Sequence, residues 1–311
     1  MAASHHSLKR QQYYFDYITH CEMCGSDAAG HKVLGQRLNQ TQGMNPKKVT
    51  GISVSVLRCS NCNLIYSNPL PIPFNIQDHY GLPPEEYWNT QNFEWDEKYF
   101  SEQIKKTKEL LGFKEGMKAL DCGAGLGKGM LSLQHAGFDT YGFEPSVPFY
   151  ERALSQMKID PARLKLGMLE DFNYEENFFD FINFGAVLEH FYHPDDCIQR
   201  AIKWLKPGGV LHIEVPSSKH LVARLLNMYY RVRGTNYVTH LSPMHSPFHL
   251  YEFDVRSFSE NSKLHKQYTI AYYKYDVGTI FHGPRFIQPV LKKYMEMTNT
   301  GLQLVIWLRK K

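Results

Sequence analysis

Four of the six cysteines in the chain are placed so that they could bind one metal ion. They form the Cys-x-x-Cys pairs CEMC and CSNC, at Cys21, Cys24, Cys59 and Cys62. Each pair can direct two thiolates at one ion, and together they supply the tetrahedral four-sulfur shell that Zn²⁺ favours. We therefore expect a zinc site in this part of the chain. Four separate thiols, a redox-active pair, or a shell in which His20 replaces a cysteine are the alternatives.

A second stretch, ALDCGAGLGKG at residues 119–129, could bring the backbone close to a bound cofactor. It contains Gly123, Gly125, Gly127 and Gly129. The dinucleotide-binding pattern GxGxxG does not fit, because Lys128 and Met130 stand where that pattern requires glycine. The pattern that does fit is an acidic residue followed by GxGxG. Asp121, at the end of the apolar run, could contact an amino-acid-like group.

The elements that must position this loop alternate between strands and helices from Met117 onwards. We expect strands at residues 117–122, 139–145, 164–169, 179–187, 210–216, 268–278 and 302–310. We expect helices at residues 97–111, 129–137, 147–157, 195–205 and 284–297. Such alternation predicts an α/β fold, a Rossmann-like, mostly parallel seven-stranded sheet with helices on both faces. Ligands of such sheets bind at the carboxyl ends of the strands, where the glycine loop lies.

The chain divides into three parts by this pattern. Residues 1–73 form a small N-terminal zinc ribbon, with a strand at residues 47–59 that leads into the second cysteine pair. Prolines 69, 71 and 73 are expected to end its ladder. Residues 74–116 form a helical linker or lid, and residues 117–311 form the α/β domain.

The composition argues against a membrane protein and excludes few other classes of protein. Apolar residues make up 43% of the 311 residues, and the formal net charge is +4. No apolar run reaches the roughly 18 residues of a membrane-spanning helix, and the start MAASHHSLKR has no signal-peptide core. We therefore expect a cytoplasmic protein without a membrane partner.

The ordered motifs resemble those of the class I S-adenosylmethionine-dependent methyltransferases, over residues 117–311. The glycine loop fits the first motif of that family, with Asp121, Gly123, Gly125 and Gly127. The segments FDFINFGAVLEH, which contains Asn183, and LKPGGVLHIEVP fit its fourth- and fifth-strand motifs. The resemblance implies a methyltransferase that binds S-adenosylmethionine.

The resemblance also implies roles for individual residues. Glu144, in GFEPS at the end of the second strand, fits the acid that binds both ribose hydroxyls. Asp171 would accept a hydrogen bond from the adenine amino group, and Phe172 would lie near the adenine ring. Asn183 would belong to the same cofactor site.

The cysteine pairs followed by this domain resemble a bacterial methyltransferase subfamily with an N-terminal zinc-binding domain. That subfamily includes sugar C-methyltransferases and enzymes of surface-polysaccharide and natural-product pathways. The resemblance implies a small-molecule acceptor, either a nucleotide-linked sugar or a natural-product intermediate. The sugar enzymes carry a longer C-terminal part, so the acceptor and the methylated atom stay open, as does the oligomeric state.

Three histidines are candidates for the base that removes a proton from the acceptor, because histidine suits this task near neutral pH. His190 follows the fourth strand, and His245 and His249 lie in SPMHSPFHLYEF after the fifth strand, where Tyr251 would help to cap the pocket. A structural turn at Glu189 and His190 is the alternative. Some quinone-pathway relatives hold a divalent metal in the same region.

An RNA methyltransferase that grips nucleic acid with its ribbon is the alternative function. It would be expected to show a basic stripe with exposed aromatic residues, whereas Lys47–Lys48 and Arg231–Arg233 are scattered basic pairs. Its cysteines would also be more closely spaced, so a nucleic-acid partner is disfavoured. A third option, a non-catalytic subunit that binds the cofactor, is disfavoured by the intact glycine loop.

Overall fold

The structure, a computed structural model, describes residues 13–38, 52–85, 94–278 and 286–311. Its largest element is a seven-stranded sheet. The strands are β6 (Lys118–Cys122), β7 (Asp139–Glu144), β8 (Leu164–Leu166), β9 (Phe179–Gly185), β10 (Leu205–Pro216), β12 (Tyr268–Asp276) and β13 (Gln303–Lys310). Their order is β12-β13-β10-β9-β6-β7-β8. Neighbours from β10 to β8 are parallel, and β13 is antiparallel to both β10 and β12.

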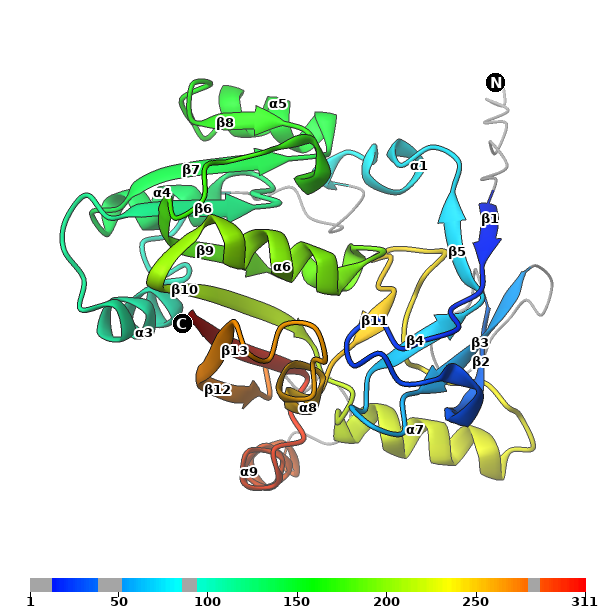
Figure 1. The fold of residues 1–311 in the computed structure, drawn as a ribbon. Helices are drawn as coiled ribbons and strands as arrows, with labels where there is room; N and C mark the ends of the chain where they lie inside the picture. Colours follow the sequence, from blue (N-terminus) through cyan, green and yellow to red (C-terminus); the bar gives the residue numbers. More distant parts are fainter. Residues whose placement is uncertain (1–12, 39–51, 86–93, 279–285) are drawn as a thin grey trace, which may run out of the picture.

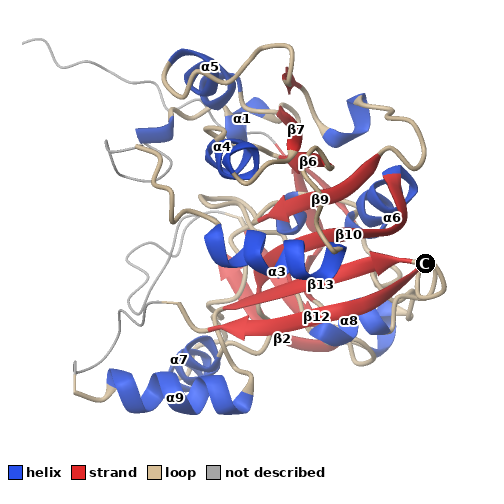
Figure 2. Ribbon diagram, turned by 90° about the vertical axis from the view of Figure 1, so that its left-hand side faces the viewer, coloured by secondary structure: helices blue, strands red, loops and turns tan. Residues whose placement is uncertain are grey.

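Helices cover both faces of this sheet (Figures 1 and 2). The described residues contain the helices α1 (Gln77–Tyr80), α3 (Ser101–Leu111), α4 (Lys128–His135), α5 (Val147–Ser155), α6 (Pro194–Trp204), α7 (Leu221–Val232), α8 (Val255–Ser259) and α9 (Gln288–Thr298), of which α7 and α9 lie away from the faces of this sheet. Short 3₁₀ turns lie at Ala28–Gly30, Leu169–Asp171 and Leu188–His190. The α/β fold expected from the sequence is confirmed, since α6 lies on one face and α3 and α4 lie on the other.

The core explains why the central strands read as continuous apolar runs. On β9, Phe181 packs with Ile104 of α3 and Leu133 of α4. The next residue, Ile182, belongs to the cluster of Ile198 on α6. A strand buried on both faces needs apolar side chains at successive positions, and FDFINFG supplies them.

A second, four-stranded antiparallel sheet holds the cysteine pairs and has the order β11-β4-β3-β2. It consists of β2 (Lys32–Leu38), β3 (Ser53–Arg58), β4 (Ile65–Asn68) and β11 (Tyr251–Glu252). Strand β11 comes from the segment after β10, so Tyr251 pairs with Tyr66 of β4. The ribbon and the segment that follows the fifth strand of the main sheet therefore form one packed unit (Figure 1).

The prolines after Asn68 do not end strand pairing, which corrects the sequence expectation. β5 (Leu70–Pro73) pairs with β1 (Tyr13–Asp16) as a two-stranded antiparallel ladder. An edge strand tolerates proline because one side of its backbone needs no partner. The expected helix at residues 284–297 begins in part outside the described residues, and its described part is α9. The three domain boundaries stay a prediction.

Candidate functional site

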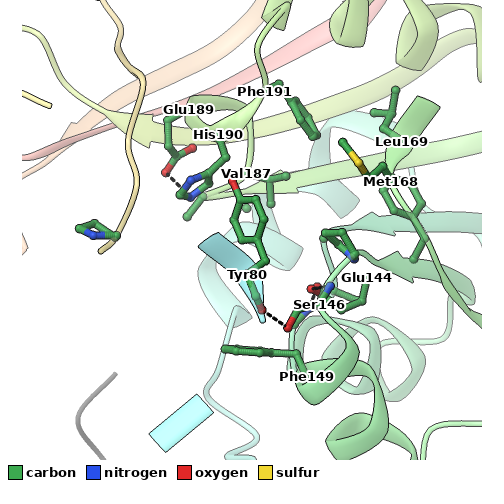
Figure 3. Close-up of a pocket in the computed structure, with 18 of the residues that line it drawn as sticks. Tyr80, Glu144, Ser146, Phe149, Met168, Leu169, Val187, Glu189, His190 and Phe191 are labelled. Carbon is green, nitrogen blue, oxygen red and sulfur yellow. Dashed lines mark hydrogen bonds and ion pairs between the residues drawn. The ribbon is translucent and has the colours of Figure 1, made fainter. Parts of the chain in front are cut away.

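A cavity of about 460 Å³ opens at the carboxyl ends of β6, β7 and β9. Its wall includes the glycine loop, the ends of these strands and the segment before β11. Glu144 and Ser146 lie on one side of it, and Glu189 and His190 lie on the other, with Tyr80 between them (Figure 3). Three of the expected cofactor residues, Gly123, Gly125 and Glu144, therefore share one cavity with two of the expected catalytic residues, His190 and His249.

The glycine loop lies against the cavity because its backbone takes conformations that favour glycine. Gly123 has a φ of +66°, and a Cβ there would lie 2.8 Å from Cγ2 of Val187, which also lines the cavity. Gly125 has a φ of +56°, and its N–H donates to Glu144 Oε2 at 2.7 Å. The loop thus aims a backbone donor at the acid that ends the neighbouring strand. Gly127, the residue before α4, packs against Ile159, behind the loop.

Glu144 is buried at the end of β7, and both of its carboxylate oxygens accept backbone hydrogen bonds. Oε2 accepts from Gly125, and Oε1 accepts from the N–H of Ser146 at 2.8 Å. Burial raises the pKa of Glu144 to about 7, although the two backbone donors act in the opposite direction. Each oxygen keeps a second lone pair, so the carboxylate can accept two further hydrogen bonds.

Asp121 is buried behind the loop and begins a chain of polar groups across three strands. Asn183 on β9 donates from Nδ2 to Asp121 Oδ1 at 2.7 Å. Asn183 Oδ1 lies 2.7 Å from Nδ1 of His212 on β10, and this nitrogen must donate because an amide oxygen only accepts. Burial raises the pKa of Asp121 to about 6, and the hydrogen bond from Asn183 opposes that rise. Asp121 and Asn183 therefore form part of a buried hydrogen-bonded chain behind the glycine loop.

The segment expected to hold adenine contacts the cavity through its first residues. Met168, Leu169 and Glu170 line the cavity. Asp171 is exposed, and its carboxylate accepts from the N–H of Met168 at 2.7 Å. Phe172 packs on Phe143 with ring centroids 5.0 Å apart. The structure thus places Asp171 and Phe172 behind the residues that form this part of the wall.

Glu189, His190 and His249 meet at the other end of the cavity. Glu189 Oε1 lies 4.0 Å from His190 Nε2 and 3.7 Å from His249 Nε2. His190 Nδ1 lies 3.3 Å from the carbonyl oxygen of Phe248 and must be the donor, which leaves Nε2 free of a proton in the neutral ring. The ligand atoms of all three residues lie within 4.8 Å of one another, a spacing that could also hold a divalent cation.

Burial dominates the electrostatics of this cluster. It raises the pKa of Glu189 to about 8 and lowers the pKa of His190 to about 4. It also lowers the pKa of His249 to about 3, although 28% of that side chain remains exposed and keeps part of its hydration. Within the described residues, Glu189 Oε2 is buried without a hydrogen-bond partner. Both imidazoles are therefore neutral near pH 7, and the lowered pKa values make them weak bases in this cavity.

The other two catalytic candidates are not brought to this cavity. His245 Nε2 lies 3.2 Å from Arg37 Nη2 on β2, and Arg37 is buried. Tyr251 is fully buried in β11, and its hydroxyl donates to the carbonyl oxygen of Tyr192 at 2.9 Å. Among the described residues that line the cavity, neither His245 nor Tyr251 is present.

The sequence predicted a linker or lid at residues 74–116 but did not identify the residues of that segment that line the cavity. Tyr80 and Ile76, at the two ends of α1, line it. The Tyr80 carbonyl oxygen accepts from Ser146 Oγ at 2.6 Å (Figure 3). Gln77 Nε2 donates to the Pro145 carbonyl oxygen at 3.0 Å. These bonds tie α1 to the turn after Glu144. The aromatic, irregular sequence of this segment carries no motif that would have revealed it.

The four cysteines expected to bind zinc come together. Sγ of Cys21 lies 3.6 Å from Sγ of Cys62, and Sγ of Cys24 lies 3.5 Å from Sγ of Cys59. A tetrahedral shell with Zn–S bonds of about 2.3 Å requires sulfurs about 3.8 Å apart. All four side chains are buried, and each pair is followed by a residue with positive φ, Gly25 at 72° and Asn63 at 63°. The geometry therefore fits one zinc ion.

His20 is not part of the cysteine cluster. Its Nδ1 lies 3.1 Å from Thr19 Oγ1, and the side chain is exposed. The groups next to the sulfurs are Ser26 and His31. Ser26 Oγ lies 3.1 Å from Sγ of both Cys24 and Cys59, and 3.0 Å from His31 Nε2. Hydrogen bonds of this kind orient ligands around a bound ion.

In the described part of the chain, no helix combines the length and the apolar character needed to cross a bilayer.

Comparison with known proteins identifies the type of domain. A family model described as "Methyltransferase domain" matches residues 95–255, more than half of the chain. The match begins before α3 and ends at the start of α8, so it includes the whole cavity except the residues of α1, the β5–α1 loop and β13.

Curated relatives and solved structures share only part of the chain. The lovastatin nonaketide synthase mokA of Monascus pilosus is 28% identical over 160 residues, which are 48% of this chain and 5% of that protein. The polyketide synthase component of the lovastatin nonaketide synthase of Aspergillus terreus is 29% identical over the same shares. The solved YcgJ protein of Bacillus subtilis is 15% identical, with a TM-score of 0.48, over 68% of this chain and 97% of that one.

Proposed function

Because the chain belongs to the methyltransferase-domain family and is an S-adenosylmethionine-dependent methyltransferase, we propose that it methylates a small molecule held between Glu144 and the Glu189–His190–His249 cluster. One observation carries this proposal. A buried carboxylate suited to a nucleoside and two neutral imidazoles line opposite sides of the same cavity (Figure 3).

The residues present fit S-adenosylmethionine. Glu144 would accept hydrogen bonds from both ribose hydroxyls with its remaining lone pairs. The backbone at Gly123 would approach the methionine part, supported by Asp121. Met168 and Leu169 would contact the adenine ring, and Asp171 would hold Met168 in place through its N–H. When bound, this cofactor supplies an electrophilic methyl group.

The protein's own task is then to orient the acceptor and to accept its proton. We assign the proton to Nε2 of His249 or His190, since both side chains line the cavity. Glu189 lies 3.7 Å from one imidazole and 4.0 Å from the other. Burial raises its pKa to about 8, so it is mostly protonated near pH 7 and would pair with an imidazolium only once it has lost its own proton. An ion pair formed away from water gains more than one at the surface.

The acceptor that we favour is a natural-product intermediate or a nucleotide-linked sugar. The relatives are polyketide synthases by name, although the chain matches only 5% of their length. Much of the cavity wall is apolar or aromatic, as in Tyr80, Val187 and Phe191. Such walls exclude water and favour an acceptor with an apolar portion.

We further propose that the four cysteines hold one structural zinc ion. Four sulfur ligands leave no open position for a substrate. The sulfurs are buried, and the cluster is continuous with the main core. Reduced cysteines of this kind are typical of the cytoplasm, where we place the enzyme.

The function is tested by incubating the protein with S-adenosylmethionine and a panel of acceptors, with mass detection of a product heavier by one methyl group. The panel contains polyketide intermediates, nucleotide sugars and bulk RNA. We expect product from one of the first two classes. Product from RNA alone would contradict the proposal and support the nucleic-acid alternative.

The proton acceptor is tested in the same assay. His249→Ala or His190→Ala should lower kcat by about 10²–10⁴-fold, the usual contribution of a general base, with S-adenosylmethionine affinity unchanged. His265→Ala is the matched control, since that side chain is exposed and its Nδ1 contacts the carbonyl oxygen of nearby Asn261 in the turn after α8. Near-full turnover in both cavity variants would show that the reaction rests on positioning alone, as an amine acceptor would allow.

A further inference from the structure

Helices α7 and α9 carry exposed apolar stripes on their outer sides. The stripe of α7 consists of Leu225, Met228, Tyr229 and Val232, and that of α9 and its N-terminal flank consists of Phe286, Ile287, Val290, Tyr294 and Met297. Val232 is 82% exposed and Met297 is 75% exposed. Soluble surfaces rarely keep so many large apolar side chains together unless the surface binds something.

The two stripes belong to one face of the molecule. Both views place α7 and α9 along the lower edge of the protein, with the rest of the chain above them (Figures 1 and 2). The backbone N–H of Leu221, at the start of α7, donates to the Thr300 carbonyl oxygen just after α9. On each helix the buried positions, Ala223 and Tyr230 on α7 and Met295 on α9, lie opposite the exposed stripe at helical spacing.

The charges beside these stripes are almost all positive. Residues 221–233 and 286–299 contain five basic side chains and one acidic side chain, Glu296. The basic residues are Arg224, Arg231, Arg233, Lys292 and Lys293, all exposed. The whole chain, by contrast, has 35 Lys and Arg against 31 Asp and Glu. The basic excess is therefore concentrated around the apolar face.

We propose that this face, defined by α7 and α9, docks on an anionic lipid bilayer surface. Apolar side chains between basic ones are the pattern of helices that lie in the membrane interface, with the apolar face among the acyl chains and the cations at the headgroups. A second copy of the chain fits less well. In a two-fold dimer the same patch faces itself, so the five cations would meet five others with little acid to balance them.

Short segments join the docking face to the cavity wall. Pro216 and Gln303 line the cavity; α7 begins at Leu221, shortly after Pro216, and α9 ends at Thr298, shortly before Gln303. The proposal does not depend on the proposed function, and it differs from the sequence expectation that the protein has no membrane partner.

Vesicle sedimentation tests the docking. The full chain is mixed with vesicles of equal parts phosphatidylglycerol and phosphatidylcholine, or with vesicles of phosphatidylcholine alone, at about 0.1 M and about 0.5 M salt. We expect sedimentation with the anionic vesicles at low salt, and much less under the other conditions. Protein that stays in the supernatant with anionic vesicles at low salt overturns the proposal.

Charge variants distinguish docking through this face from a general electrostatic attraction between a basic protein and anionic vesicles. Arg224→Gln with Arg231→Gln should weaken binding to anionic vesicles about thirtyfold, from the usual contribution of each basic residue near such a surface. Lys105→Gln with Lys114→Gln, an equal loss of charge at and beyond α3, is the control and should change binding little. Equal effects of the two pairs would overturn the proposal.

The apolar stripes need a separate variant. Val232→Asp with Met297→Asp changes only highly exposed side chains, so folding and S-adenosylmethionine binding should be retained, and vesicle binding should be lost. Sedimentation equilibrium of the same proteins gives the competing outcome. A wild-type dimer that this variant dissociates, without vesicle binding, would assign the face to a second copy and overturn the proposal.

Discussion

Replacing Glu144 by glutamine tests the cofactor site most sharply. The carboxylate accepts the N–H groups of Gly125 and Ser146 at 2.7 and 2.8 Å, one on each oxygen. A glutamine amide would turn its NH₂ group towards one of these donors, and it could accept from only one side. We expect Glu144→Gln to weaken S-adenosylmethionine binding by about 1.5–3 kcal/mol, the range of a hydrogen bond to a charged group. This corresponds to about a ten- to hundredfold higher Kd.

The pH dependence of the wild type follows from the same residue. Burial raises the pKa of Glu144 to about 7, and the ribose hydroxyls require an ionised acceptor. Protonation competes with binding below that pKa, so affinity should rise as pH rises through about 7 and level off above it. Between about pH 6 and about pH 8 we expect about a tenfold gain in affinity. Glu144→Gln has no proton to lose and should show little of this dependence.

Isothermal calorimetry at several pH values measures both effects. Glu170→Gln is the matched control, because Glu170 is an exposed acid on the same cavity wall. It should bind with nearly wild-type affinity and keep the wild-type pH dependence. Equal affinity of wild type and Glu144→Gln at about pH 8 would refute the placement of the ribose. A wild-type affinity that does not change with pH would refute the assigned pKa.

The cysteine cluster, the glycine loop and the segment over the cavity each supply a further test. Elemental analysis of reduced protein should find about one zinc per chain, and Cys59→Ser should lose the zinc and lower the thermal midpoint; zinc-free wild type would contradict the site. Gly129→Ala should destabilise the fold by about 1–3 kcal/mol, because the new Cβ would lie 2.6 Å from Asp121 Oδ2. Gly30→Ala is the control and should leave stability nearly unchanged, because there is open space around Gly30. Denaturant titration measures the stability of both variants. Tyr80→Ala removes a ring between the two sides of the cavity and should raise KM more than it lowers kcat, so an unchanged KM would argue against its role.

The sequence predicted those parts of the fold and site that depend on local pattern. The alternation of strands and helices identified the main sheet, because buried parallel strands need apolar runs such as that of β9. The Cys-x-x-Cys spacing brought the four cysteines to one cluster, because each pair forms a turn closed within a few residues. Glu144 was predicted from its resemblance to a family motif, and the structure places it on the cavity wall at the end of β7.

The rest depended on contacts between distant segments. Nothing in the residues around Tyr251 indicates that they pair with β4, about 185 positions earlier, and this pairing decides that Tyr251 leaves the cavity wall while His249, two residues before it, remains there. Residues two positions apart in an extended strand point to the same face, so strand alternation alone would not separate these two candidates; Tyr251 is separated from the cavity by its pairing into the second sheet. His245 is withdrawn in a similar way by buried Arg37 on β2. The N-terminal ribbon would therefore act on the proposed catalytic site indirectly, because its sheet holds the strand that follows His249. Loss of the proposed zinc ion should therefore lower turnover, because it would disturb the position of His249. The loss of turnover should exceed any change in S-adenosylmethionine affinity, because the cofactor would bind at the ends of β6 and β7.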